Sequence, residues 1–169
     1  YAVTPVVIFD GVIKTNLSSA VLSLVPRFFV LGAILCFSFI LIAKQIWSDK
    51  TSSIMGFAAA NPNTGYFGLP VVLAVFGEEM FSVATLIAFG AVLFSDTIGY
   101  YTVARGNLDL RKAFLKTAAL PTVYAFILVV IVSSTQIPLG GAYDTIALYF
   151  RVAFTILGML ILGVALADV

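Results

Sequence analysis

The sequence is short of the residues that carry most protein chemistry. It has no histidine and one cysteine, Cys36, which excludes a disulfide framework and the usual histidine and cysteine zinc sites. It also has no Gly-x-x-x-x-Gly-Lys-Ser/Thr phosphate loop, no dinucleotide glycine fingerprint, and no serine or cysteine paired with histidine. The sequence therefore lacks the motifs that ATP-driven pumping and nucleophilic hydrolysis need. We expect no enzyme, no cofactor and no metal site.

Charge is scarce as well. Charged residues make up 10% of the 169, and the formal net charge is +1, so the chain has no basic surface for nucleic acid. Hydrophobic residues make up 62%, and the mean hydropathy is +1.13, far above the range of soluble domains. The composition predicts an all-α, multi-pass integral membrane protein in contact with lipid, in a plasma or inner membrane.

Five apolar runs reach the roughly 20 residues that a membrane-spanning helix needs. These runs are residues 27–47, 53–77, 81–105, 120–137 and 143–166. Residues 1–13 form a shorter apolar run, which we interpret as the second half of another span. Because the chain starts at Tyr1 and ends at Val169 directly after an apolar run, we expect it to be a fragment of a longer protein.

Basic residues orient these spans, because short cytoplasmic loops collect Lys and Arg. They follow the first and third complete spans, whereas the turn after the second span is acidic. We therefore place Lys44, Lys50 and the loop 105–116 in the cytoplasm, and Glu78, Glu79, Gly140 and Gly141 outside.

One span is interrupted by helix-breaking residues. Residues 60–70 read ANPNTGYFGLP, which places two prolines, two glycines and two asparagines inside an apolar run. Proline removes a helical hydrogen bond, and lipid cannot satisfy the carbonyl that is left. Broken helices are therefore tolerated where they are buried in protein or line a polar cavity, and transporters use them to bind solutes. The sequence predicts a solute site at this break.

The half-helix after the break would point its free N–H groups and positive dipole end at the solute, which suits an organic anion. Asn63 is the first candidate, because its neutral amide can donate to a carboxylate. The alternative is that Asn63 only caps the half-helix. Asn61 is the second candidate. We add Gly65 and Gly68, where the backbone can approach closely, and we assign Pro62 and Pro70 to the architecture of the break.

Asp96 lies inside the predicted span 81–105, beside Ser95. A mid-membrane aspartate costs about 2.5 to 3.5 kcal/mol on insertion scales, so it should face the bundle interior. Three roles stay open: proton coupling, contact with a cation or the substrate, and hydrogen-bonded packing. Asp10 and Asp168 lie near span ends, where water makes a structural role more natural. Arg151 is expected to snorkel or to pair with Asp144, two turns away.

The break carries a resemblance to a known family. NTGYFGLPVVLAVFG at 63–77 resembles the auxin efflux carrier family, which contains plant PIN exporters and bacterial organic-acid permeases. TPVVIF at 4–9 is similar to the family's second helix, and GMLILGVAL at 158–166 resembles its seventh, although the usual proline of that helix is not evident. The chain would then run from part of the second helix through the seventh.

The resemblance implies a ten-helix carrier of two inverted five-helix repeats, whose fourth and ninth helices are broken and cross each other. It also implies elevator-type transport of small organic anions, such as dicarboxylates or auxin-like weak acids, with Asn63 at the substrate and a proton or sodium as coupling ion. On this mapping residues 27–105 belong to the transport domain and residues 1–26 and 120–169 to the scaffold, through which we expect a homodimer. Residues 106–119 form the cytoplasmic linker.

Three other interpretations remain open. A sodium-coupled symporter of the bile-acid type resembles the same fold, but it would need more cation ligands than this sequence offers. A non-transporting membrane subunit or sensor would use the broken helix only for packing. An intramembrane enzyme comes last, because Asp96 has no obvious catalytic partner.

Overall fold

The computed structural model describes residues 3–14, 18–104, 111, 115, 117–135 and 139–167, and each regular element in these ranges is a helix. The predicted all-helical fold is thereby confirmed for this part of the chain. Several predicted features lie outside the described residues, namely most of the linker 106–119, the basic residues Arg105, Lys112 and Lys116, and Asp168.

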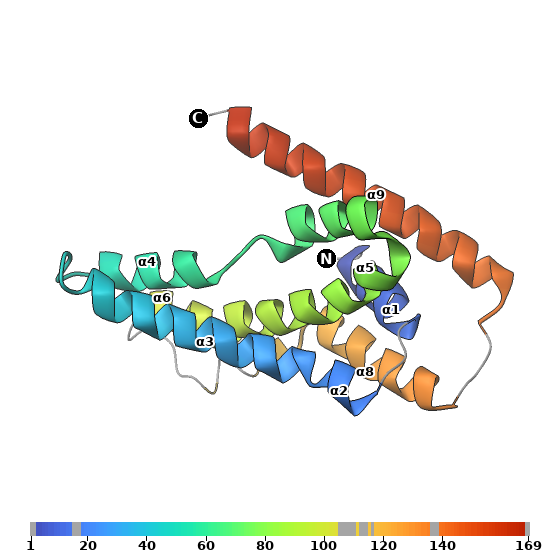
Figure 1. Cartoon of the computed structure of the whole chain (residues 1–169), viewed down its shortest axis with the longest axis horizontal. Helices are drawn as coiled ribbons and strands as arrows, with labels where there is room; N and C mark the ends of the chain where they lie inside the picture. Colours follow the sequence, from blue (N-terminus) through green and yellow to red (C-terminus); the bar gives the residue numbers. More distant parts are fainter. Residues whose placement is uncertain are drawn as a thin grey trace. The chain divides into compact units, whose positions relative to one another are not determined.

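The helices follow the predicted apolar runs, with shifted ends (Figure 1). α3 starts before the predicted residue 27. It ends at Ala43 instead of the predicted residue 47, because residues 44–46 form a turn. The elements are α1 (Val3–Ile13), α2 (Ser19–Leu22), α3 (Leu24–Ala43), α4 (Thr51–Ala60), the π-helical turn η1 (Thr64–Gly68), α5 (Leu69–Phe94), the π-helical turn η2 (Ser95–Gly99), α6 (Tyr100–Ala104), α8 (Pro121–Thr135) and α9 (Gly141–Ala167).

Among the residues that the structure describes, three stretches are long and apolar enough to cross a membrane, namely Ser19–Ala43, Thr51–Val103 and Gly141–Ala167. The second has 53 residues, which is too long for one crossing of a hydrocarbon core about 30 Å thick. It contains the predicted span 53–77 and most of the predicted span 81–105. α1 and α8 are apolar but shorter. The helices therefore indicate a multi-span membrane protein.

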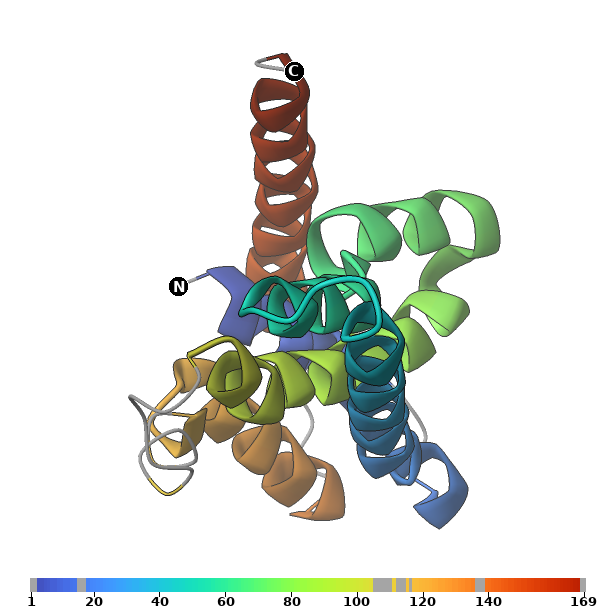
Figure 2. The ribbon, with the colours of Figure 1, turned by 90° about the vertical axis from the view of Figure 1, so that its left-hand side faces the viewer.

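Two interruptions divide the stretch Thr51–Val103. The predicted break is present, since α4 ends at Ala60 and residues 61–63 are not helical before η1 begins. The second interruption is the predicted turn at Gly77, whose φ of 78° and ψ of −171° lie outside the helical range. Glycine tolerates this positive φ at little steric cost. The chain doubles back within α5, as Figures 1 and 2 both show.

Contacts divide the chain into two compact units, and each is described by itself. Unit 1 comprises Tyr1–Leu22, Asn63–Ala88 and Pro121–Val169. In it α1 packs against α8 and α9, and α9 packs against η1. Its buried core consists of Val7, Leu69, Phe81, Ala88 and Phe154. The predicted grouping of residues 27–105 as one transport domain stays a prediction.

Unit 2 comprises Ser23–Pro62 and Phe89–Leu120, and its main contact is between α3 and α4. The core is small and consists of Cys36, Ile40, Ala60 and Phe94. Glycines let the backbones approach: a Cβ atom at Gly32, Gly56, Gly90 or Gly99 would lie under 3.0 Å from a neighbouring atom. Close contact through small residues replaces the hydrophobic drive that is missing in lipid.

Gly56 gives a test of this packing. A Cβ at Gly56 would overlap the Ile40 side chain and the Cys36 carbonyl oxygen. We expect Gly56→Ala to lower the free energy of unfolding by about 1–3 kcal/mol through overpacking. The measurement is loss of helical circular dichroism of the full chain in detergent during titration with a denaturing detergent.

Gly163→Ala is the matched control, because a Cβ at Gly163 in α9 would meet nothing within 4 Å. It should leave the unfolding free energy unchanged or raise it by up to about 1 kcal/mol, since alanine favours helix over glycine. Equal destabilisation by the two substitutions would refute the close contact between α3 and α4.

Candidate functional site

Asn63 starts the half-helix after the break. Its side-chain Oδ1 accepts a hydrogen bond from the Tyr66 backbone N–H at 3.1 Å, which is the geometry of an N-cap. Its backbone oxygen accepts from the Gly68 N–H at 3.1 Å, which closes the wide π-helical turn. The structure therefore shows the capping role. Contact of the exposed Asn63 side chain with a substrate stays a prediction.

The other predicted residues of the break differ in accessibility. Asn61, Pro62 and Asn63 are exposed, Gly65 and Gly68 are partly buried, and Pro70 is buried. A Cβ at Gly65 would meet nothing within 4 Å, and at Gly68 it would make only ordinary contacts. The expected close backbone approach at these two glycines is thus not found within the described part of the chain.

Close approach occurs instead at Gly158 of α9, which the sequence did not single out for this purpose. Pro70 has no N–H to donate to the carbonyl of Tyr66, four residues earlier. That carbonyl lies against Gly158, where an added Cβ would be 3.1 Å from the Tyr66 oxygen. The Tyr66 ring also stacks on Phe154, with ring centroids 5.7 Å apart. α9 therefore supports the backbone of the break.

Asp96 and Ser95 lie in η2, a second π-helical turn, and both are partly buried. The Asp96 backbone oxygen accepts a hydrogen bond from Thr117 Oγ1 at 3.0 Å. π-helical turns often occur at functional sites. Asp96 belongs to unit 2 and Asn63 to unit 1, so each site is described separately. Proton or ion coupling at Asp96 stays a prediction.

A cluster of four charged residues lies in unit 1 and was not predicted. Arg151 of α9 contacts two carboxylates: its Nη2 lies 2.8 Å from Asp10 Oδ2 of α1, and its Nη1 pairs with Glu78 Oε1 at the bend of α5. Lys14 Nζ lies 3.1 Å from Asp10 Oδ1 and 4.0 Å from Glu78 Oε2. We call these four residues the ion cluster. The expected pairing of Arg151 with Asp144 is wrong.

Burial differs sharply within the ion cluster. The side chains of Asp10 and Arg151 are 2% and 5% exposed, whereas those of Lys14 and Glu78 are 36% and 62% exposed. Asp10 is well satisfied, because Oδ1 also accepts a hydrogen bond from the Tyr143 hydroxyl at 3.3 Å. The two positive and two negative charges balance, as buried ions require. Asp10 and Arg151 thus form the inner pair of the cluster, and Lys14 and Glu78 its outer pair.

Glu78 lies between the apolar runs that end at Gly77 and start at Phe81. The hydrogen bond from Arg151 is the main reason why the pKa of Glu78 lies below its usual value. Partial burial opposes this shift, while the positive charges of Arg151 and Lys14 add to it. Glu78 therefore remains a carboxylate at neutral pH.

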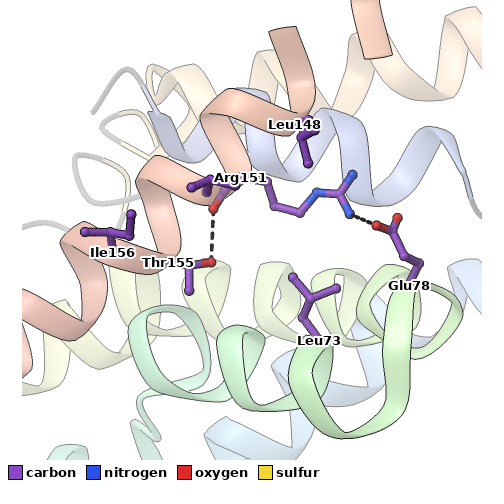
Figure 3. A pocket seen from close by; sticks show the side chains of 7 residues that line it. Leu73, Glu78, Leu148, Arg151, Thr155 and Ile156 are labelled. Atoms are coloured by element: carbon purple, nitrogen blue, oxygen red, sulfur yellow. Dashed lines mark hydrogen bonds and ion pairs between the residues drawn. The ribbon is translucent and has the colours of Figure 1, made fainter. Parts of the chain in front are cut away.

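A pocket of about 220 Å³ adjoins the ion cluster (Figure 3). Arg151 and Glu78 lie at one end of it, with Leu148 and Leu73 on either side of the Arg151 side chain. The remaining lining residues are Val152, Thr155 and Ile156 of α9. The Thr155 hydroxyl donates to the Arg151 backbone oxygen at 3.0 Å, so its proton is already used within α9. The rest of this wall is apolar. The pocket combines one charged end with a hydrophobic body.

The sequence did contain a signal for the ion cluster. Asp10 and Arg151 both lie within apolar helices, and ionisable residues in such helices generally pair with one another. Placing Asp10 at a span end, next to water, hid this signal. A search for opposite charges on different apolar runs would have found the pair.

The inner pair gives a stability prediction. Asp10→Asn leaves the buried Arg151 charge without its inner partner, and breaking a buried pair in this way is strongly destabilising. We expect a loss of about 3 kcal/mol in unfolding free energy, at the low end for such pairs because Glu78 still contacts Arg151. Unfolding of the full chain in detergent measures it.

Asp144→Asn is the matched control, because Asp144 is exposed on the same helix as Arg151 and should change stability by less than about 0.5 kcal/mol. The double variant Asp10→Leu with Arg151→Met removes both buried charges and should be more stable than Asp10→Asn. A double variant less stable than the single one would contradict the proposed energetic role of the pair.

Comparison with known proteins adds no assignment. No protein-family model, no curated protein and no solved structure matches this chain. The resemblance to the auxin efflux carrier family therefore depends on the motif residues 63–77 and their flanks alone.

Proposed function

We propose that this chain forms part of a secondary transporter for small organic anions, with the substrate at the broken helix. The observation that carries the proposal is the non-helical segment 61–63 between two apolar helices. Irregular backbone at membrane depth needs protein or a water-filled cavity around it. Asn61, Pro62 and Asn63 are exposed, so a polar cavity at the break is the simplest environment for them.

The chemistry of the break favours an anion. The helical segment that starts at Thr64 continues to Phe76, and its first N–H groups and positive dipole end face the break. Asn63 Oδ1 satisfies one of these N–H groups, so its amide nitrogen is the atom left to meet a carboxylate. A neutral donor permits release as well as binding, which a carrier requires.

The family resemblance supplies the rest of the proposal. It suggests an elevator motion, in which one bundle slides against a scaffold, and dicarboxylates or auxin-like weak acids as substrates. The sodium-coupled symporter and the non-transporting sensor are the alternatives that the experiments below separate from this proposal.

Asn63 provides the direct test of the site. Uptake of a labelled organic-acid panel is measured in proteoliposomes that contain the full-length protein. Asn63→Ala removes both the cap and the amide, whereas Asn63→Ser keeps a capping oxygen and loses the amide. If Asn63 binds the substrate, both variants should lose at least about tenfold in transport efficiency, because a charge-assisted hydrogen bond contributes roughly 1.5–3 kcal/mol.

Gln45→Ala removes an exposed amide in the turn after α3 and should leave uptake unchanged. Normal uptake by Asn63→Ser would show that the residue only caps the half-helix. Absence of saturable uptake of any acid by the folded wild type would favour the sensor, and uptake that depends on sodium would favour the symporter.

Asp96 provides the test of coupling. If Asp96 carries the proton, Asp96→Asn should abolish the stimulation of uptake by an imposed pH gradient, because asparagine cannot release a proton. Uptake without a gradient should be affected less. Asp144→Asn, at an exposed position, is the control. Unchanged stimulation in folded Asp96→Asn would exclude Asp96 as the coupling residue.

A further inference from the structure

The pocket beside Arg151 does not include the non-helical residues 61–63 of the break and has a distinct chemical character. Its volume is about 220 Å³, and Leu73, Leu148, Val152 and Ile156 make most of its wall apolar. The charged group of this wall that is buried is Arg151, whose side chain is 5% exposed. Pockets that combine an apolar wall with a few fixed polar groups are typical of small-molecule sites.

The three nitrogen atoms of the Arg151 guanidinium differ in their partners. Nη2 faces the buried Asp10, which also contacts Lys14 and Tyr143. Nη1 faces Glu78, whose side chain is 62% exposed. Nε is buried and has no hydrogen-bond partner within the part of the chain that the structure describes. Because the Nε–H lies on the same edge of the guanidinium as Nη2, the contact that an incoming acceptor can take over is the one that Glu78 makes with Nη1.

We propose that this pocket binds a small amphiphilic carboxylate, whose head group takes the place of Glu78 on Arg151 and whose apolar tail lies along Leu73, Leu148, Val152 and Ile156. Glu78 acts as a built-in competitor: its carboxylate occupies Arg151 in the empty pocket and turns toward solvent when the ligand enters. The proposal does not depend on the transport function.

Three properties of the pocket determine the ligand class. Arginine presents planar, charged N–H donors that match a carboxylate, and the head group of the ligand would take over the Nη1 contact that Glu78 makes. The apolar wall requires a hydrophobic tail. The volume is below the 300–1,000 Å³ of drug-sized sites, so the tail must be short.

Glu78 can exchange, whereas Asp10 cannot. Asp10 is held by three partners and buried, so removing it from Arg151 would leave charges unpaired in a low-dielectric environment. Glu78 is exposed enough to be hydrated once it leaves, so its contact with Arg151 is weakened by solvent more than the buried contact with Asp10. An incoming carboxylate therefore competes with a weak contact and retains the strong one.

Hexanoate is the probe, and the full chain in phosphatidylcholine nanodiscs is the sample. Binding is measured by isothermal titration calorimetry, with acetate as the head group alone and hexan-1-ol as the tail alone. We expect saturable binding of hexanoate and weaker binding of both fragments. Hexan-1-ol binding as tightly as hexanoate, or no saturable binding of hexanoate, would overturn the proposal.

Glu78→Gln distinguishes competition for Arg151 from a purely structural role of Glu78. Removal of the competing carboxylate should tighten hexanoate binding about fivefold, the factor that corresponds to the upper range of an exposed ion pair. The neighbouring exposed Glu79 is the matched control, and Glu79→Gln should leave the affinity unchanged. Unchanged or weaker binding in folded Glu78→Gln would overturn the proposal.

Two further variants locate the head and the tail. Arg151→Lys keeps the charge but loses the fork, and it should weaken hexanoate binding at least tenfold while circular dichroism confirms the helices. Val152→Phe fills the pocket and should also weaken binding, whereas Ile161→Phe, at another exposed position of α9, should not. Equal effects of the two phenylalanine variants would contradict the assignment of the tail site.

Discussion

The organisation of unit 1 depends on one buried ion pair, Asp10 with Arg151. Neither charge would be stable alone in an apolar environment, so each fixes the position of the other. The pair connects α1 to α9, and Glu78 extends the connection to the bend of α5. The hydrophobic core of Val7, Leu69, Phe81 and Phe154 comes from the same three helices. The ion pair thus determines which helices pack together, because apolar contacts alone are not selective in lipid. Apolar side chains then fill the space between these helices.

The break depends on a related requirement, which concerns the backbone. Pro70 has no N–H to donate to the Tyr66 carbonyl, and Asn63 accepts a hydrogen bond from the N–H of the same Tyr66. α9 supports both the break, through Gly158, and the ion cluster, through Arg151. The candidate substrate site and the Arg151 pocket therefore share a supporting helix. A ligand that changes the position of α9 at one site has a direct route to the other.

The sequence predicted the features that follow from local chemistry. Proline, glycine and asparagine at 61–70 indicated the break, and Gly77 with two glutamates indicated the turn, because both depend on the backbone of a few consecutive residues. The partner of Arg151 could not be inferred in the same way. Asp144 lies two turns away on the same helix, but Asp10 and Glu78 are chosen by the packing of α1, α5 and α9. The end of α3 at Ala43 was also missed, since the apolar run continues beyond it to Trp47.

The π-helical turns have a consequence for the faces of the helices that follow them. Such a turn contains one residue more than the 3.6 of an α-helical turn, and each residue rotates the helix by about 100°. Residues of α6, which follow η2 directly, therefore lie about a quarter turn away from the face that an uninterrupted continuation of α5 would give them. An apolar stripe drawn through η2 on a helical wheel joins positions that face different neighbours. Loss of one residue from η2 would restore the α-helical phase and move every later side chain of that helix to another environment.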